Sequence, residues 1–353
     1  MILVDFNGIL YQSIFRAISA VKAQKDASGM YKVSDFMPVA LSGLLMDLFS
    51  LQQDFSVKKG EIVICLDNTH PYNWRRQYLG SYKHQRKEQM EVSPIPFGEV
   101  FEKTNEFIKQ IKENTPWRVV SVPTAEADDV ILCLAKQYAK KEPVMIFSSD
   151  KDMIQAQKHG DVVQFSPLTR KWVTPETKSD NMDEWLMEHV ILGDEADDVP
   201  RITYRTEFSK AFKRYLEAKG LKISVKEYNN LPQEKQNEIE DGFDVLTSKG
   251  VKDIWTQPKL GPATLRKMKQ SGKLDEFLDS NPLYRENLER NKHLVLDEYI
   301  PAEILNNSIL NYIESAKRNF DINAFKKYLS ENGMGGLLLD LPPNFVSSLG
   351  LWD

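Results

Sequence analysis

The chain has 353 residues and a mass of 40.7 kDa, which is long enough for two domains of the usual size. Hydrophobic residues make up 41% and charged residues 27% of the sequence, so a disordered or fibrous protein is excluded. The net charge of −5 argues against a protein that simply coats nucleic acid, unless its bases are clustered. Its apolar runs are shorter than the roughly 18–20 residues of a membrane span, and the start of the sequence lacks the features of a signal peptide. We therefore expect a cytoplasmic protein without a membrane partner.

Short apolar runs alternate with helical patterns through the first half of the chain. In chain order these are ILVDF, a helix over 35–55, EIVICLD, a helix over 97–114, WRVVSV, a helix over 124–140, and VMIFSS. This alternation predicts an α/β domain with a mainly parallel sheet. After residue 194, apolar residues recur at spacings of three and four, which predicts helices. The expected division is an α/β domain over 1–193, a helical domain over 194–340 and a tail over 341–353.

Acidic residues stand where this pattern places the carboxyl ends of strands. Each acid taken singly can be explained as an ordinary turn residue or helix cap, and Glu126 or Asp129 is well suited to a helix N-terminus. Gathered at one sheet edge, such carboxylates would repel one another unless cations neutralised them. The residues concerned are Asp5, Asp67, Glu126, Asp128, Asp129, Asp150 and Asp152, with a further pair, Asp194 and Asp197, in GDEADD.

A hard divalent cation is the metal that suits these carboxylates. Mg²⁺ prefers carboxylate, water and phosphate oxygens, and two such ions about 4 Å apart can clamp a phosphoryl displacement. The five histidines are scattered, and Cys65 and Cys133 lie in apolar runs, so no spacing indicates zinc. We expect two Mg²⁺ ions, with Mn²⁺ as a substitute.

A basic and aromatic stretch, WRRQYLGSYKHQRK, follows Asp67 and contains no acid before Glu88. One interpretation of this stretch is an ordinary solvent-exposed helix face without a binding role. Uncompensated bases in an acidic protein instead favour contact with phosphates, while the rings stack on nucleobases. The stretch holds the bases Arg75, Arg76, Lys83, Arg86 and Lys87 and the aromatic residues Trp74, Tyr78 and Tyr82.

These motifs, in this order, resemble the flap endonuclease and 5′ nuclease family, and within it the RNase H group of T-even bacteriophages. The resemblance is carried by LVDF, CLDN with the basic stretch, AEADD, SSDKD and LGDEADDVP, and by YRENLERNKHLVLDEYIPAEI over 284–304. It implies a PIN-like nuclease fold for the first domain. For the second it implies a helical DNA-binding domain with a helix-three turn-helix-like element.

The resemblance also implies roles for individual residues. Residues 82–97 would form the arch through which a single 5′ strand passes. Lys83 and Arg86, in a YKxxR pattern, would steady the scissile phosphate as catalytic residues. Arg75, Arg76, Tyr82 and Lys87 would contact nucleic acid. One ion would be surrounded by Asp5, Asp67, Asp128 and Asp150, and the second by Glu126, Asp152, Asp194 and Asp197.

The segment LGPATLRKMKQSGK over 260–273 resembles the duplex-binding turn of that family, although it comes later than usual after the last acidic pair. Gly261 frees the turn and Pro262 suits the first helical turn. An ordinary capped surface helix fits the same residues equally well. The residues expected to contact nucleic acid here are Gly261, Arg266, Lys267 and Lys269.

The apolar end of the chain, NFVSSLGLWD, follows two prolines. An apolar tail is a liability in water, so it is expected to be buried. It either packs on the body of the protein or binds a sliding clamp through Leu349, Leu351 and Trp352.

The sequence therefore predicts a Mg²⁺-dependent 5′ to 3′ exonuclease and flap endonuclease that acts on branched or nicked duplex DNA and on RNA–DNA hybrids. By resemblance it would be a monomer that removes RNA primers during phage lagging-strand replication in the host cytoplasm. A sliding clamp and a single-stranded DNA-binding protein are its expected partners. A PIN-type ribonuclease and a noncatalytic nucleic-acid-binding scaffold stay open as alternatives.

Overall fold

The computed structural model describes residues 1–55, 62–174, 182–203, 260–316 and 319–337, together with positions 220, 232, 234 and 235. The chain forms two compact units. The first comprises Met1–Trp74, Lys87–Lys178 and Ile300–Asp353, and the second comprises Arg75–Arg86 and Ser179–Tyr299. The tail predicted over 341–353, with Leu349, Leu351 and Trp352, lies outside the described residues.

A six-stranded sheet forms the centre of the first unit, in the order β3-β2-β1-β4-β5-β6. Neighbouring strands from β3 to β5 run parallel, and β6 runs antiparallel to β5. The mainly parallel α/β architecture predicted from the sequence is thus confirmed. The strands are β1 (Ile2–Asp5), β2 (Ile62–Leu66), β3 (Arg118–Ser121), β4 (Val144–Phe147), β5 (Val162–Ser166) and β6 (Lys171–Val173).

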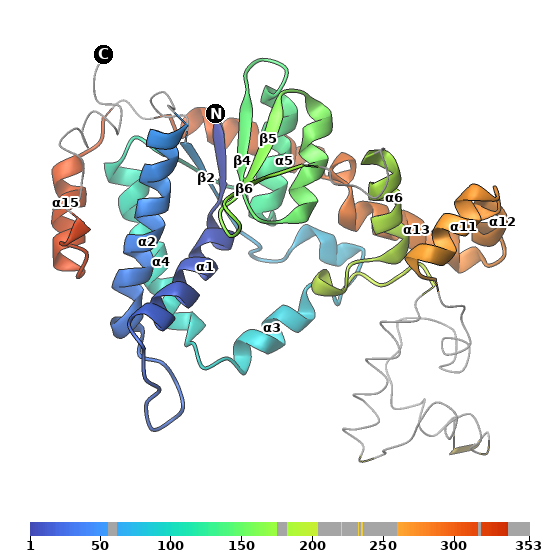
Figure 1. Ribbon diagram of the computed structural model, residues 1–353, viewed down its shortest axis with the longest axis horizontal. Coiled ribbons are helices and arrows are strands. Elements are labelled where there is room, and N and C mark those ends of the chain that lie inside the picture. The colour runs from blue at the N-terminus through green and yellow to red at the C-terminus, as the bar shows by residue number, and fades with distance from the viewer. Residues whose placement is uncertain are drawn as a thin grey trace. The chain divides into compact units, whose positions relative to one another are not determined.

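Helices cover both faces of this sheet because successive side chains of a strand point to opposite faces. Ile2 and Val4 of β1 belong to one hydrophobic core, and Leu3 between them belongs to another. Figure 1 shows α1, α2 and α4 together on one side of the sheet and α5 on the other. The bounds are α1 Phe6–Ala20, α2 Val33–Asp54, α4 Phe97–Asn114 and α5 Ala127–Tyr138.

Helix α2 differs from the sequence expectation in one respect. By length and composition alone, its Val33–Leu51 part is apolar enough to cross a membrane. Half of that window is buried, and Phe36, Leu44 and Leu48 are fully buried in the core beside α1. A helix at the centre of a globular core meets the same criterion, so α2 is explained by its packing.

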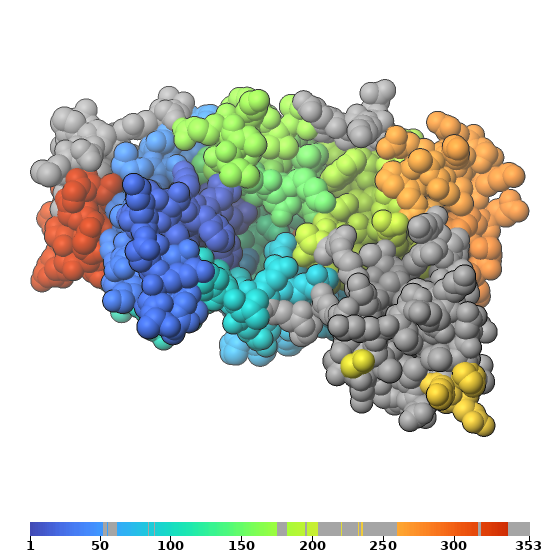
Figure 2. Space-filling view, turned by 60° about the horizontal axis from the view of Figure 1, so that its bottom comes forward, coloured from blue at the N-terminus to red at the C-terminus, as the bar shows by residue number. Residues whose placement is uncertain are grey.

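The last described helices, α14 (Ala302–Glu314) and α15 (Ile322–Glu331), belong to the first unit, although the expected boundary placed them with the helical domain. The Arg118 guanidinium of β3 lies 4.2 Å from the Tyr312 ring centre and donates to the Tyr312 carbonyl at 2.8 Å. Helix α15 adds Phe325 to the first core, and Figure 2 shows it in red against the blue surface of the N-terminal helices. An amphipathic pattern identifies a helix but not the core on which it packs.

The described part of the second unit is helical, as predicted for this part of the chain. Its core joins the described helices with Leu79 and Tyr82 from the segment 75–86. That segment continues into α3 (His84–Glu91). The helices are α6 (Met182–Leu192), α11 (Pro262–Gln270), α12 (Leu274–Asp279) and α13 (Pro282–Val295).

Candidate functional site

The sheet of the first unit brings four of the predicted carboxylates to one edge. Asp5 ends β1, Asp67 follows β2, and Asp150 follows β4. Asp128 lies in the first turn of α5, which follows β3. Because β3, β2, β1 and β4 are neighbours and parallel, their carboxyl ends lie along the same edge.

Asp5 is held by two donors at the point where β1 becomes α1. Its carboxylate caps α1 by accepting from the Gly8 N–H at 3.0 Å, and it accepts from the Ser148 hydroxyl at 2.8 Å. A Cβ on residue 8 would lie 2.5 Å from Oδ2 of Asp5, so this arrangement requires glycine. Each carboxylate oxygen has more than one lone pair, so an oxygen that accepts one of these hydrogen bonds can also bind a cation.

Asp67 links the end of β2 to the start of α5. Its Oδ1 accepts from the Ala127 N–H at 2.7 Å, and its Oδ2 accepts from the Asn7 side chain. Because an α-helix N-terminus leaves N–H groups without intrahelical partners, the carboxylate is favoured there. The bond fixes Asp67 beside the first turn of α5, which carries Asp128.

Glu126 and Asp129, at the same helix start, are more enclosed than Asp128. Asp129 is fully buried, and its Oδ2 accepts from the indole N–H of Trp74 and from the Glu126 N–H, both at 2.9 Å. Glu126 is the N-cap of α5 and takes part in the capping box with Asp129. Asp128 is half-buried. Asp129 therefore has the structural role that the sequence allowed, while Asp128 lies nearer the surface.

Asp150 and Asp152 follow β4 at the start of a 3₁₀ helix over Lys151–His159. Oδ1 of Asp150 accepts from the Asp152 N–H at 2.8 Å, and the Asp150 N–H donates to the Ser148 hydroxyl at 3.1 Å. Ser148 thus connects Asp150 to Asp5. The buried Gln164 amide donates to the Asp150 carbonyl at 2.7 Å, which fixes the backbone of this turn to β5.

Cys65 of β2 is the strand partner of Asp5 in β1. Burial raises the pKa of the Cys65 thiol well above its usual range, and the negative charges of Asp5 and Asp128 raise it further. Both charges therefore act on the end of β2. Oxygen donors along such an edge fit a hard divalent cation.

The second unit brings another predicted acid, Asp197, against the YKxxR bases. Lys83 Nζ lies 3.6 Å from one carboxylate oxygen of Asp197, and Arg86 bonds the other at 2.6 Å. The Tyr82 hydroxyl donates to the same carboxylate at 3.3 Å. Lys83 has a left-handed backbone with φ of 53°, and its N–H donates to the Asp197 carbonyl at 3.1 Å. Such a conformation is uncommon outside glycine and clusters at functional sites.

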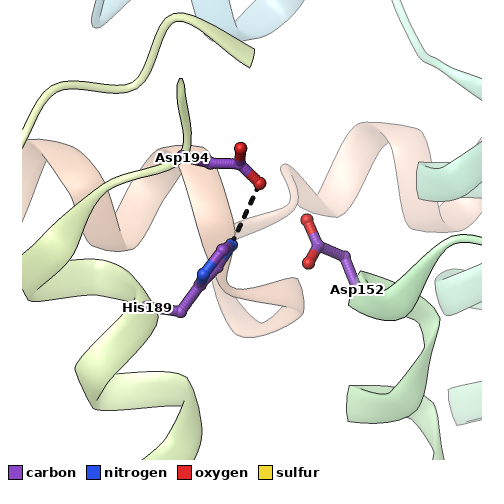
Figure 3. Close-up of side chains that lie close together, drawn as sticks. All are labelled: Asp152, His189 and Asp194. Carbon is purple, nitrogen blue, oxygen red and sulfur yellow. Dashed lines mark ion pairs between the residues drawn. The ribbon is translucent and has the colours of Figure 1, made fainter. Parts of the chain in front are cut away.

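Asp194 is paired with a histidine that the sequence analysis had left unassigned. His189 Nε2 lies 3.3 Å from Oδ2 of Asp194, and Figure 3 shows the imidazole directed at that carboxylate. The indole of Trp185 stacks on the imidazole with ring centres 5.6 Å apart. Oδ1 of Asp194 accepts from the Ala196 N–H at 2.8 Å, so the acidic loop is bonded within itself.

Some side chains of the basic stretch are buried and others are exposed, a difference that the sequence did not predict. Arg75 and Tyr82, expected to contact nucleic acid, are 5% and 3% exposed. Arg75 Nε donates to the Leu294 carbonyl at 3.0 Å, and its guanidinium lies 5.8 Å from the Tyr82 ring centre. Both side chains are therefore packing groups of the second unit in this structure. Arg76 and Lys87 are exposed.

The turn before α11 has the predicted form. Gly261 is the N-cap of α11 with Pro262 at the first position, and Arg266 and Lys267 are exposed. Lys269 instead lies 3.9 Å from the Glu188 carboxylate. Arg266 and Lys267 are thus accessible to a ligand, whereas Lys269 is engaged with α6.

Comparison with known proteins identifies the family. A family model described as 5′-3′ exonuclease, N-terminal resolvase-like domain, matches residues 1–185, which is more than half of the chain. The chain belongs to the 5′-3′ exonuclease family. The resemblance found in the sequence motifs is thus confirmed.

Two relatives support this membership. The chain is 33% identical over 161 residues to the ribonuclease H of Enterobacteria phage T4, covering 44% of this chain and 52% of that protein. It is 25% identical over 242 residues to the 5′-3′ exonuclease of Buchnera aphidicola subsp. Schizaphis graminum, covering 66% of this chain and 76% of that protein. The chain thus spans about half the length of the T4 protein.

Solved structures agree with the fold. The T5 5′-exonuclease with bound zinc ions superposes with a TM-score of 0.52 at 15% identity, covering 90% of this chain and 99% of that chain. The T5 flap endonuclease in a complex with DNA and metal ions gives a TM-score of 0.50 at 16% identity, covering 89% and 98%. At these identities the likeness concerns the fold alone.

Several residues that shape this exonuclease-family site were missed by the sequence analysis. Gly8, Ser148 and Asn7 hold Asp5 and Asp67, and Trp74 bonds Asp129. A signal existed only for Gly8, because a glycine in the first turn of a helix directly after an acidic strand end is costly unless the space is needed. Ser148 and Asn7 are ordinary polar residues whose partners are distant in the sequence. Trp74, one of the rings expected to stack on nucleobases, is instead buried with its indole N–H bonded to Asp129.

Proposed function

We propose that this member of the exonuclease family is a divalent-metal-dependent 5′ to 3′ exonuclease and flap endonuclease. The observation that carries the proposal is the alignment of Asp5, Asp67, Asp128 and Asp150 along the carboxyl edge of four adjacent parallel strands. Carboxylates held together by N–H and O–H donors suit a cation that neutralises them, and hydrolysis of a phosphodiester requires such neutralisation.

In this proposal the carboxylates serve two Mg²⁺ ions, for which Mn²⁺ can substitute. Asp5, Asp67, Asp128 and Asp150 hold the first ion, directly or through water. Bound there, such ions would lower the pKa of a water so that it loses a proton and becomes a nucleophile near neutral pH, and they would neutralise charge on the phosphate. The second ion is assigned to Glu126, Asp152, Asp194 and Asp197.

Lys83 and Arg86 act on the substrate itself. Both side chains lie against the Asp197 carboxylate, and each has donors to offer a phosphate. When a phosphodiester is bound, they orient its oxygens and stabilise the negative charge that develops during cleavage. Asp197 keeps the two bases in place before the substrate arrives.

The substrates proposed are branched or nicked duplex DNA and RNA–DNA hybrids, cut from the 5′ side to leave a 5′-phosphate. Support comes from the T4 relative, a ribonuclease H, and from the T5 flap endonuclease, which has been crystallised with DNA. Removal of RNA primers during lagging-strand replication, with a sliding clamp and a single-stranded DNA-binding protein as partners, is the role that fits these substrates. The phosphate contacts proposed for the duplex are the exposed bases Arg76, Lys87, Arg266 and Lys267.

The test is a digest of 5′-labelled flap DNA, nicked duplex DNA and RNA–DNA hybrid in Mg²⁺ and in a chelator. Asp150→Asn is the matched variant because it removes one ligand charge at constant size. We expect cleavage by the wild type in Mg²⁺ alone, and a loss of at least about a hundredfold in Asp150→Asn with binding of branched DNA retained. Wild-type rates for Asp150→Asn at limiting Mg²⁺ would refute the metal assignment.

An RNA hairpin in the same series separates the alternatives. A PIN-type ribonuclease shares the acidic sheet edge and would cut the RNA hairpin in preference to the DNA flap. A noncatalytic scaffold would bind both substrates and cut neither. Preference for the 5′ flap supports the proposed exonuclease and flap endonuclease.

A further inference from the structure

Both ends of the acidic loop that carries Asp194 and Asp197 are held by one side chain of α13. Asn291 is fully buried, and its Nδ2 donates to the Val190 carbonyl at 2.9 Å and to the Pro200 carbonyl at 2.7 Å. Val190 lies in the last turns of α6, and Pro200 lies just beyond the loop. A single amide group thus joins two backbone positions ten residues apart.

The hydrogen bonds of Asn291 also fix the orientation of its amide. Its Oδ1 accepts from Nε of Arg290 at 3.1 Å and from Nη2 of Arg290 at 2.8 Å. The oxygen is therefore turned toward the guanidinium and the NH₂ group toward the two carbonyls, and both N–H donors of the amide are used. Leucine has a similar volume but no donor, and aspartate has no N–H, so neither can replace these bonds.

The loop between these ends is short and closely packed. Asp194 and Val199 exchange two backbone hydrogen bonds of 2.9 and 2.8 Å, and Ile202 N donates to the Ile191 carbonyl at 3.1 Å. Gly193 has φ of 72°, and a Cβ there would collide with the backbone of Val199 and Pro200. The backbone ladder closes the loop, while Asn291 ties both of its ends to α13.

We propose that Asn291 is a positioning residue for the divalent metal that Asp194 and Asp197 bind. It acts by fixing the ends of the acidic loop, so that the two carboxylates keep their places when no substrate is present. The inference rests on the proposed function, because that function assigns these two acids to a metal. Residues that orient metal ligands typically change metal affinity about 10- to 100-fold when they are replaced.

The experiment compares Asn291→Leu with Leu288→Ala in the full-length chain. Leu288 is 5% exposed and lies in the same helix and the same core, but its side chain has no polar group to bond the loop. Leu288→Ala therefore controls for general loss of stability in the second unit. Asn291→Gln, which keeps the amide but changes its reach, is the conservative variant.

Three quantities are measured in each variant: the melting temperature, amide hydrogen exchange over residues 193–199, and Mn²⁺ binding by isothermal titration without nucleic acid. For Asn291→Leu we expect faster exchange in the loop and about tenfold or greater loss of Mn²⁺ affinity at one site. Leu288→Ala should lower the melting temperature by a similar amount and bind Mn²⁺ as the wild type does. Partial recovery of Mn²⁺ affinity is expected in Asn291→Gln.

Wild-type Mn²⁺ affinity in Asn291→Leu would overturn the inference. An equal loss of Mn²⁺ affinity in Asn291→Leu and Leu288→Ala would overturn it too. The nuclease assay separates this outcome from failure of the proposed function. If the wild type cuts flap DNA and Asn291→Leu binds Mn²⁺ normally, the positioning role fails and the function stands. If the wild type binds Mn²⁺ but cuts no substrate, and Asn291→Leu still loses affinity, the function fails and the positioning role stands.

Discussion

Replacing Gly8 by alanine should lower the cleavage rate while leaving the stability of the fold almost unchanged. A Cβ at this position would lie 2.5 Å from Oδ2 and 3.2 Å from Oδ1 of Asp5, distances too short for a side chain that stays in place. The Asp5 carboxylate would have to rotate away from the Gly8 N–H that it caps and from the Ser148 hydroxyl. Because Asp5 is proposed as a metal ligand, the rotation should change the metal site directly.

The expected change in stability is small. Alanine in place of glycine within a helix stabilises the folded state by about 1 kcal/mol at most. Loss of the Asp5 cap costs about 1 kcal/mol, so the two effects offset each other. Cleavage should nevertheless fall about a hundredfold, and half-saturation by Mg²⁺ should require about 10- to 100-fold more metal.

The assay is flap cleavage over a range of Mg²⁺ concentrations, together with thermal unfolding of the same preparations. Gly43→Ala is the matched control, because Gly43 also lies inside a helix but a Cβ there meets nothing within 4 Å. The control should keep full activity and gain a little stability. Wild-type cleavage by Gly8→Ala at limiting Mg²⁺ would show that the geometry of Asp5 does not matter for catalysis.

Three further predictions follow from the placement of individual side chains. Lys83→Ala should lower the single-turnover rate at saturating enzyme about a hundredfold, while the Kd for flap DNA should change by only a few fold. If the cleavage rate and the DNA affinity fell by the same factor, Lys83 would not act by stabilising developing charge. Arg75→Ala should reduce the free energy of unfolding by about 1–3 kcal/mol, because it leaves the Leu294 carbonyl without this donor, and thermal unfolding measures this loss. Arg76→Ala should instead weaken DNA binding and reduce the salt slope of the binding constant by about one, which DNA binding at several salt concentrations measures. Burial, followed by the charge of Glu106, raises the pKa of Tyr328 from 10.0 to about 12, so its contribution to stability is complete below pH 10 and is lost as the pH rises toward 12. Tyr328→Phe should lose less stability than the wild type over that interval, and identical pH profiles would contradict the burial of this hydroxyl.

The revised expectation for Arg75 illustrates what the sequence could not provide. Five bases and three aromatic residues within fourteen positions indicated a nucleic-acid surface, and that pattern treats all of them alike. In the structure, Arg75 is buried with its Nε bonded to the Leu294 carbonyl of α13, more than 200 residues later in the chain, and Tyr82 is buried in the core of the second unit. Local composition records charge, but burial depends on partners that are distant in sequence.

The fold of the first unit was predictable because its signals are local. A period-two or fully apolar run marks a buried strand, a spacing of three and four marks a helix, and their alternation implies parallel strands. The helix expected over 97–114 is found at those residues. The same regularity placed Asp5, Asp67 and Asp150 at strand ends, since parallel strands end at a common edge.

The sequence by itself determined the class of fold, the family and the acidic edge, because each follows from residue types at fixed short spacings. Tertiary structure decided which residues hold that edge in place. Helices α14 and α15 pack in the first unit, although they follow the second unit in the chain. Residue 8 must be glycine because of its contact with Asp5, and Asn291 bonds backbone groups about 100 residues earlier in the chain. The physical cause of these arrangements is shape and hydrogen-bond complementarity between distant segments, for which a single sequence carries no local pattern.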